Sequence, residues 1–122
     1  MTAALSWLGV LVCGGLGSLL RFTVDRAVSR RTAQRFPLGT MVVNVTGALL
    51  LGFVAGLVLN PHLALLAGTS FVGAYTTFST WMLETHRLSE ERQLWPALAN
   101  IVVSLALGIA AAVLGQSIAG LL

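Results

Sequence analysis

The charged residues of this chain are confined to two short stretches, and this distribution constrains the fold more than any other feature. All eleven Arg, Asp and Glu side chains lie within residues 21–35 and 84–92. The rest forms uncharged runs of 20 residues (1–20), 48 residues (36–83) and 30 residues (93–122). Uncharged apolar runs of about 18 residues or more are typical of membrane-spanning helices. The chain is therefore predicted to be an integral membrane protein.

The length of the uncharged runs predicts the number of spans. A helix needs about 20 residues, at 1.5 Å each, to cross a bilayer, so the 48-residue run holds two spans. Asn60-Pro61 divides them, because proline cannot continue a helix and disfavours helical geometry in the residue before it. We expect a single all-α membrane domain over residues 1–122. Its four predicted transmembrane helices cover about residues 3–22, 38–59, 62–83 and 97–121.

The composition argues against an enzyme and against a nucleic-acid-binding protein. Only 9% of the residues are charged, whereas soluble domains have about 25%. The sequence has no nucleophile paired with a base, no metal-binding cluster and no phosphate-binding loop, so we expect no enzymatic activity. The net charge of +3 comes from arginines at the ends of the predicted spans, and we interpret these as topology signals.

The arginines predict an orientation. Four spans place the loops 22–37 and 84–96 on one side, and both termini on the other. All seven positive residues are arginines on the first side, with Arg21 at its boundary. By the positive-inside rule that side is cytoplasmic, and both termini of this cell-membrane protein are predicted to face outward.

The third predicted span contains a segment that disfavours helix. Five of the nine residues from Gly73 to Trp81 are Gly, Thr or Ser, which are mediocre or poor helix formers. A break near the middle of the membrane is expected, because broken helices expose carbonyls that form ion sites. The alternative is a continuous helix whose hydroxyls bond back to the preceding turn.

The second predicted span combines a close-packing stripe with a polar one. Ala48, Gly52 and Gly56 are four residues apart, which allows close approach of another helix. The same face continues to Asn44 and Thr40. A carboxamide at that depth needs a hydrogen-bond partner or a wet cavity.

The polar residues that remain within the spans are neutral. No acidic residue lies in the core of any predicted span, which argues against proton-coupled transport. Hydroxyl and amide donors, together with the positive edges of aromatic rings, suit a small anion or a polar solute. These candidates are Asn44, Asn100, Thr40, Thr77, Ser79, Thr80 and Ser104, beside the rings of Phe78 and Trp81.

Three sequence strings carry a resemblance to a known family. They are Leu20-Arg21-Phe22, the Gly-Thr-Met-Val-Val-Asn-Val-Thr-Gly of residues 39–47, and the Gly-Ala-Tyr-Thr-Thr-Phe-Ser-Thr of residues 73–80. Over essentially its whole length the chain resembles the CrcB, or Fluc, fluoride channels. The resemblance implies passive fluoride export, which lowers fluoride toxicity, through an antiparallel dimer. It also implies two pores along the subunit interface and a structural sodium ion at its centre.

By position, the resemblance also implies roles for single residues. Backbone carbonyls of Gly73 and Thr76 would hold the sodium ion. Asn44 matches a pore asparagine, and Phe78 matches the first of two phenylalanines whose ring edges line the fluoride path. The other matches are polar positions near that path (Thr77, Ser79, Thr80 and Ser104), the arginine that ends the first span (Arg21), and an acidic residue near a pore entrance (Glu84).

The chain departs from the family pattern at two positions. Trp81 stands where the second pore phenylalanine is expected, and Asn100 stands where a tyrosine is common one turn before Ser104. Tryptophan keeps a ring edge and adds an N–H donor, but its larger size implies an altered or closed pore. Gly108, one turn after Ser104, offers no hydroxyl to continue the polar track.

The one-sided arginines bear on assembly. An antiparallel homodimer needs one sequence to insert in both orientations, which requires nearly balanced arginines. Seven against none is unbalanced, so we hypothesise pairing with an oppositely oriented homologous chain. Three functions stay open at this point: a fluoride channel, a coupled small-solute exporter, and a subunit that only supports the pore of a homologous partner.

Overall fold

The chain is all helical in the computed structural model, which describes residues 2–32 and 36–122. The elements are α1 (Ala3–Arg31), α2 (Leu38–Gly56), α3 (Pro61–Ala64), the π-helix η1 (Leu65–Val72), α4 (Gly73–Tyr75), α5 (Ser79–Glu90) and α6 (Leu94–Gly120). Within these described ranges, three helices are long and apolar enough to cross a membrane, namely α1, α2 and α6. The prediction of an integral membrane protein is confirmed.

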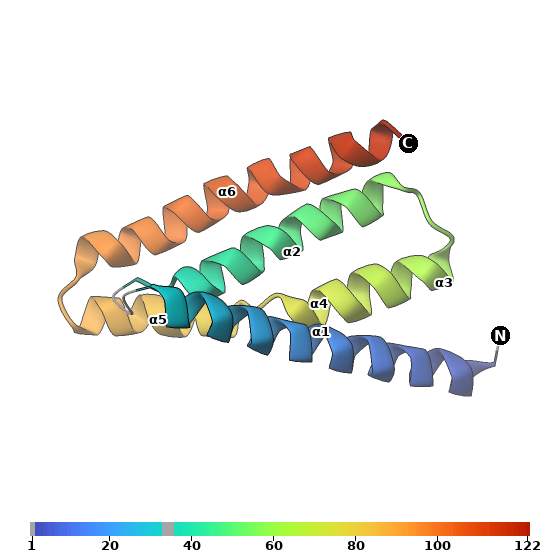
Figure 1. Cartoon of the computed structure of the whole chain (residues 1–122), viewed down its shortest axis with the longest axis horizontal. Helices are drawn as coiled ribbons and strands as arrows, with labels where there is room; N and C mark the ends of the chain where they lie inside the picture. The colour runs from blue at the N-terminus through green and yellow to red at the C-terminus, as the bar shows by residue number, and fades with distance from the viewer. Residues whose placement is uncertain (1, 33–35) are drawn as a thin grey trace.

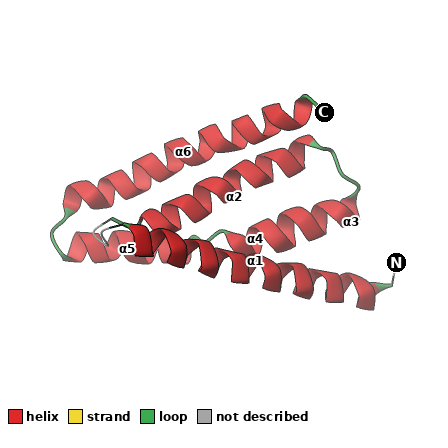
Figure 2. Cartoon of the chain, viewed as in Figure 1, coloured by secondary structure: helices red, strands yellow, loops and turns green. Residues whose placement is uncertain are grey.

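The helices run roughly along one long axis (Figures 1 and 2). Helix α2 lies between α6 on one side and the α3–η1–α4 segment on the other, and α1 packs against η1, α4 and α2. Both termini lie at the same end of the molecule as the α2–α3 connection. The opposite end carries α5 and the connections into α2 and α6. The segment from Pro61 to Glu90 returns along this axis as a series of shorter helices.

The predicted division at Asn60-Pro61 is correct, and the local chemistry explains it. Helix α2 ends at Gly56, and α3 begins at Pro61. The side chain of Asn60 caps α3 by accepting a 2.9 Å hydrogen bond from the N–H of Leu63. Proline suits the first position of a helix because its missing N–H would have no partner there.

The boundaries predicted for the charged stretches are wrong. We expected loops over 22–37 and 84–96, but α1 continues to Arg31 and α5 to Glu90. Arg and Glu favour helix. Two side-chain pairs one turn apart also support α5, His86–Glu90 at 3.3 Å and Arg87–Glu91 at 3.6 Å. Helix α6 likewise starts at Leu94, before residue 97.

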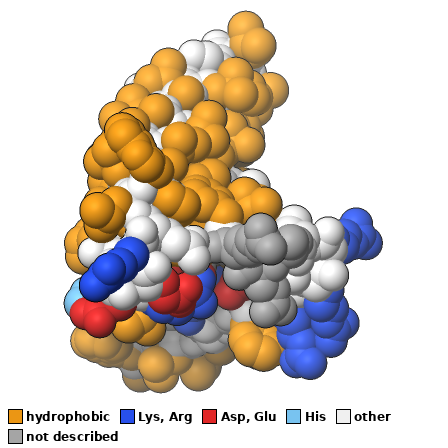
Figure 3. Space-filling view, turned by 90° about the vertical axis from the view of Figure 1, so that its left-hand side faces the viewer, with side chains coloured by type: hydrophobic (Ala, Val, Ile, Leu, Met, Phe, Trp, Pro, Cys, Tyr) orange, Lys and Arg blue, Asp and Glu red, His pale blue; other side chains and the backbone are white. Residues whose placement is uncertain are grey.

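The charges gather at one end of the described molecule. Figure 3 shows arginine and acidic side chains at the end that holds α5, below a largely hydrophobic surface. Arg35, one of the seven arginines, lies outside the described residues.

The contact between α2 and α6 depends on small residues, as predicted for Gly52 and Gly56. A methyl group added at Gly52 would collide with the carbonyl of Ala112, and one at Gly115 would collide with the carbonyl of Leu49. Such close backbone approach is how helices associate where the hydrophobic effect gives no drive. Ala48, the third residue of the predicted stripe, lines a groove on another side of α2. Helix α2 therefore closes one side against α6 and leaves another open.

Candidate functional site

The helical backbone is interrupted between α4 and α5, within the segment where the sequence disfavours helix. Helix α4 ends at Tyr75, and Thr76 has extended backbone angles (φ −86°, ψ 162°). Helix α5 begins at Ser79. In this stretch the N–H of Thr76 still donates to the carbonyl of Val72, and the carbonyl of Phe78 still accepts from the N–H of Met82. The N–H and carbonyl of Thr77 need hydrogen-bond partners from elsewhere in the molecule.

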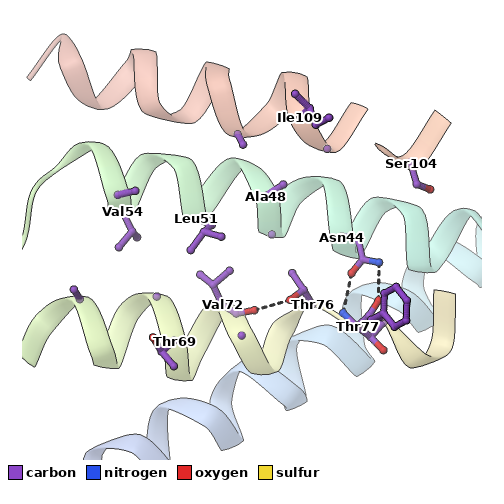
Figure 4. A pocket seen from close by; sticks show the side chains of 18 of the residues that line it. Asn44, Ala48, Leu51, Val54, Thr69, Val72, Thr76, Thr77, Ser104 and Ile109 are labelled. Carbon is purple, nitrogen blue, oxygen red and sulfur yellow. Dashed lines mark hydrogen bonds between the residues drawn. The ribbon is translucent and has the colours of Figure 1, made fainter. Parts of the chain in front are cut away.

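Asn44 on α2 supplies those partners for Thr77. Its Nδ2 donates to the carbonyl of Thr77 at 2.8 Å, and the N–H of Thr77 donates to its Oδ1 at 2.8 Å. Figure 4 shows both bonds bridging α2 and the interruption. The carboxamide thus pairs with the backbone as a neighbouring peptide group would. The sequence predicts a hydrogen-bond partner for Asn44, and that partner is the backbone of Thr77. The second hydrogen of Asn44 Nδ2 is not used in this pairing.

Two backbone N–H groups at the interruption do not bond to the carbonyls that would accept them in a continuous helix. The N–H of Thr77 would bond to the carbonyl of Gly73, and that of Thr80 to the carbonyl of Thr76. They bond instead to Asn44 Oδ1 and, at 3.2 Å, to Thr77 Oγ1. The carbonyls of Gly73 and Thr76 are left without their helical partners. These are the two carbonyls that the family resemblance assigns to sodium, and freed carbonyl oxygens fit a hard cation.

A groove of about 870 Å³ lies along the open side of α2, between α2, the η1–α4 segment and α6. Figure 4 shows its polar end around Asn44, Thr77 and Ser104, and its apolar wall farther along. The predicted site residues that line the groove are Asn44, Gly73, Thr76, Thr77, Phe78, Trp81 and Ser104. Two features suit an anion. Phe78 is 70% exposed, and the hydroxyl oxygen of Ser104 is buried with no hydrogen-bond partner among the described residues.

A second, much smaller cavity of about 20 Å³ lies at the charged end, and this volume holds about one water-sized molecule. The residues that line it are Arg21, Asp25, Thr40, Val43, Thr77 and Thr80. Thr77 borders both cavities. Within the described ranges, Arg21 Nε is a buried donor with no hydrogen-bond partner.

Glu84 lies on α5, directly after the third predicted span. The pKa of its carboxyl is raised, and burial is the largest cause. A hydrogen bond with Thr40 and the charge of Arg87 lower this pKa, whereas the charge of Asp25 raises it, and the net effect is upward. One of its oxygens, Oε1, is buried without a hydrogen-bond partner among the residues described. The carboxyl therefore holds its proton to higher pH than an exposed glutamate does.

Three of the remaining polar candidates do not offer a free donor to the groove. Ser79 is exposed, lines neither cavity, and has its hydroxyl 3.4 Å from that of Thr77. Asn100 is fully buried and donates from Nδ2 to Thr85 Oγ1 at 2.9 Å. The indole N–H of Trp81 donates to the backbone carbonyl of Asn100 at 3.1 Å.

Three hydroxyl residues near the site, Thr85, Tyr75 and Thr46, were not among the predicted site residues. Thr85 accepts from Asn100 and donates to the carbonyl of Trp81. Tyr75 is buried, and its hydroxyl lies 2.8 Å from that of Thr46 on α2. The position of Thr85, one helical turn after Trp81, is the sequence signal that could have found it.

Residues 8–116 match the family model described as CrcB-like protein, Camphor Resistance (CrcB). The chain belongs to the CrcB family. It is also similar to curated CrcB relatives over most of its length. It is 69% identical over 113 residues to "Fluoride-specific ion channel FluC 2" of Mycobacterium bovis, covering 93% of this chain and 90% of that protein.

Two further relatives extend this similarity. The protein of the same name from Mycolicibacterium paratuberculosis is 66% identical over 121 residues, covering 99% of each chain. "Fluoride-specific ion channel FluC 1" of Streptomyces avermitilis is 44% identical over 115 residues, covering 91% of this chain and 93% of that protein. The CrcB assignment therefore rests on nearly the whole chain.

Proposed function

We propose that this CrcB chain is a fluoride-selective ion channel, not an enzyme, and that it exports fluoride passively from the cytoplasm. The observation that carries the proposal is the Asn44–Thr77 pairing, which holds an interrupted helix against α2 between two cavities. The names of the relatives supply the ion. Fluoride is close to a water molecule in size, and it needs N–H and O–H donors to replace its hydration.

The proposed fluoride path begins at the charged end. The small cavity offers the unpartnered Arg21 Nε and the hydroxyls of Thr40 and Thr80. Thr77 is common to both cavities and leads into the groove. There the ion meets the second hydrogen of Asn44 Nδ2, the ring edge of Phe78 and the Ser104 hydroxyl. Arg21 and Asp25, which both line the small cavity, are the charged residues of this proposed path, and the other groups named are neutral. The path therefore attracts the anion without trapping it.

The proposed placement in the membrane has four spans, with the interruption at Thr76–Phe78 near mid-membrane. The termini share one end of the molecule and the arginines gather at the other. By the positive-inside rule the arginine end is cytoplasmic and both termini face outward.

The groove is the proposed seat of a second subunit in an antiparallel dimer. Its wall is mostly apolar, and it lies open on the side of the bundle where Gly73 and Thr76 line it. The freed carbonyls of these two residues would hold the structural sodium ion. When bound, that ion would supply positive charge beside these carbonyl oxygens.

The one-sided arginines support a partner that is homologous but oppositely oriented. A role as a subunit that mainly supports its partner's pore is the second candidate function. It is favoured by one observation, namely that the N–H of Trp81 is already bonded within the chain. A coupled small-solute exporter is the less supported alternative, because the predicted spans lack carboxylates.

The test is fluoride efflux from liposomes, measured with a fluoride electrode. The samples are this chain alone, a homologue with arginines on the opposite side alone, and the two together, with chloride efflux as the control. The channel proposal predicts fluoride efflux by the pair without a pH gradient and no chloride efflux. Fluoride efflux that requires a pH gradient contradicts it. The absence of fluoride efflux from both the pair and this chain alone also contradicts it. Fluoride efflux from an antiparallel dimer of this chain alone contradicts the partner hypothesis only.

A further inference from the structure

Three side chains join α5 to α6 in a closed ring of hydrogen bonds. The indole N–H of Trp81 donates to the backbone carbonyl of Asn100 at 3.1 Å. The Nδ2 of Asn100 donates to Thr85 Oγ1 at 2.9 Å, and the Thr85 hydroxyl donates to the carbonyl of Trp81 at 2.8 Å. Each residue gives one hydrogen bond and receives one.

The ring fixes the direction of each bond. The single hydroxyl proton of Thr85 goes to Trp81, so its oxygen accepts from Asn100. This holds the Asn100 amide with Nδ2 toward Thr85. Its Oδ1 is then a fully buried acceptor without a hydrogen-bond partner in the described part of the chain. An unpaired acceptor repels an anion, and Asn100 is fully buried and does not line the groove, so the ring offers fluoride no ligand there.

The ring holds Trp81 against Phe78, an exposed residue of the groove. The two aromatic rings meet edge to face, with centroids 5.8 Å apart and an interplanar angle of 84°. Trp81 is half-buried, whereas Phe78 is 70% exposed. An exposed side chain keeps its orientation only when a fixed neighbour supports it, and Trp81 is that neighbour.

The ring also occupies the carbonyl to which Ser104 would normally bond. Serine and threonine in helices commonly donate to the carbonyl four residues earlier. In this chain Thr23, Thr46, Thr85 and Ser117 do so. For Ser104 that carbonyl belongs to Asn100, which receives the indole N–H. Ser104 lines the groove, and its buried hydroxyl oxygen has no hydrogen-bond partner among the described residues.

We propose that Trp81, Asn100 and Thr85 form a positioning ring that sets Phe78 and frees Ser104 on the wall of the groove. The inference rests on the proposed channel function. It makes Trp81 a positioning residue whose N–H serves the ring and not the ion. It adds Thr85, a residue outside the groove, to the groups that determine fluoride flux.

The test compares Thr85→Val, which removes the hydroxyl at nearly constant shape, with Thr85→Ser, which keeps it. Thr23→Val is the matched control, because the Thr23 hydroxyl makes the same kind of backbone bond on an exposed part of α1. Hydrogen exchange of the indole N–H is followed by NMR in lipid nanodiscs. The Trp81 signal is identified by its absence in Trp81→Phe. Fluoride efflux is measured on the same proteins, with the homologous partner where flux requires it.

In the wild type, the Trp81 N–H is expected to exchange at least about tenfold more slowly than those of Trp7 and Trp95, which are exposed. Thr85→Val is expected to speed that exchange and to lower fluoride flux by about two- to tenfold, the equivalent of one hydrogen bond. Thr85→Ser and Thr23→Val leave both near the wild-type values.

Fast exchange of Trp81 in the wild type overturns the ring. Loss of exchange protection in Thr85→Val with unchanged flux overturns the positioning role. Absence of any wild-type fluoride flux contradicts the proposed function instead, and the exchange data still decide whether the ring exists.

Discussion

The segment around the interruption is held on two sides, and the two contacts use similar residues to opposite effect. On the α2 side, Asn44 bonds to the backbone of Thr77 and diverts a donor from the helix. Carbonyls and an amide hydrogen stay available there. On the α6 side, Trp81, Asn100 and Thr85 bond to one another in a ring, and Asn100 is fully buried. The polar groups left over, and not the residue types, distinguish the proposed ion path from a structural contact.

Breaking the α2 contact is expected to have the largest effect. Asn44→Leu leaves the N–H and the carbonyl of Thr77 unpaired, which costs about 2 to 4 kcal/mol of unfolding free energy. The measurement is denaturant unfolding in detergent micelles. Asn60→Ala is the comparison variant: it removes the asparagine that caps α3 at the α2–α3 connection and is expected to lose about 1 kcal/mol. An equal or smaller loss for Asn44→Leu would show that the pairing does not hold the interruption.

Separating α2 from α6 is expected to have the next largest effect. Gly52→Ala places a methyl group against the carbonyl of Ala112, and the strain costs about 1 to 3 kcal/mol. Gly15→Ala is the matched control on α1, because a methyl there meets nothing within 4 Å. The same unfolding experiment applies to both. Equal stability of the two variants would mean that the ring on α5, and not the glycine contact, holds α6 in place.

The charged end of the molecule sharpens the comparison through pH. Burial raises the pKa of Glu84 in the folded protein, so the folded state binds this proton more tightly than the unfolded state does. The stabilisation is fully present below the ordinary carboxyl pKa and is lost as pH rises through the raised pKa.

Glu84→Gln removes this dependence. Groups facing Glu84 are Asp25 on α1, Thr40 on α2 and Arg87 on α5. Thermal unfolding across this pH window should show the wild type losing stability relative to Glu84→Gln as pH rises. A gap between the two proteins that stays constant or moves the other way would mean that burial does not raise this pKa.

The sequence predicts the membrane character and the chain division well, for identifiable reasons. Charge placement determines which segments can face lipid, and Asn60-Pro61 ends one helix and caps the next. The same charge pattern misled us about the ends of α1 and α5. Charged residues outside the membrane are as compatible with helix as with loop.

The site is less predictable because its key contacts join distant segments. Composition indicates a weak helix between Gly73 and Trp81, but the stop at Tyr75 depends on Asn44, which lies 33 residues from Thr77. The ring likewise needs the rotation of α5 against α6, which no local pattern specifies. The sequence therefore shows which polar groups are present, and the packing decides which of them stay free.

The most direct test of the account fills the groove. At both Gly108 and Gly15 an added Cβ atom meets nothing within 4 Å, but only Gly108 lines the groove. Fluoride efflux from liposomes is compared for Gly108→Trp and Gly15→Trp, each with the partner that the wild type requires. The account predicts that Gly108→Trp abolishes fluoride efflux and that Gly15→Trp retains it. Wild-type efflux from Gly108→Trp would contradict the account.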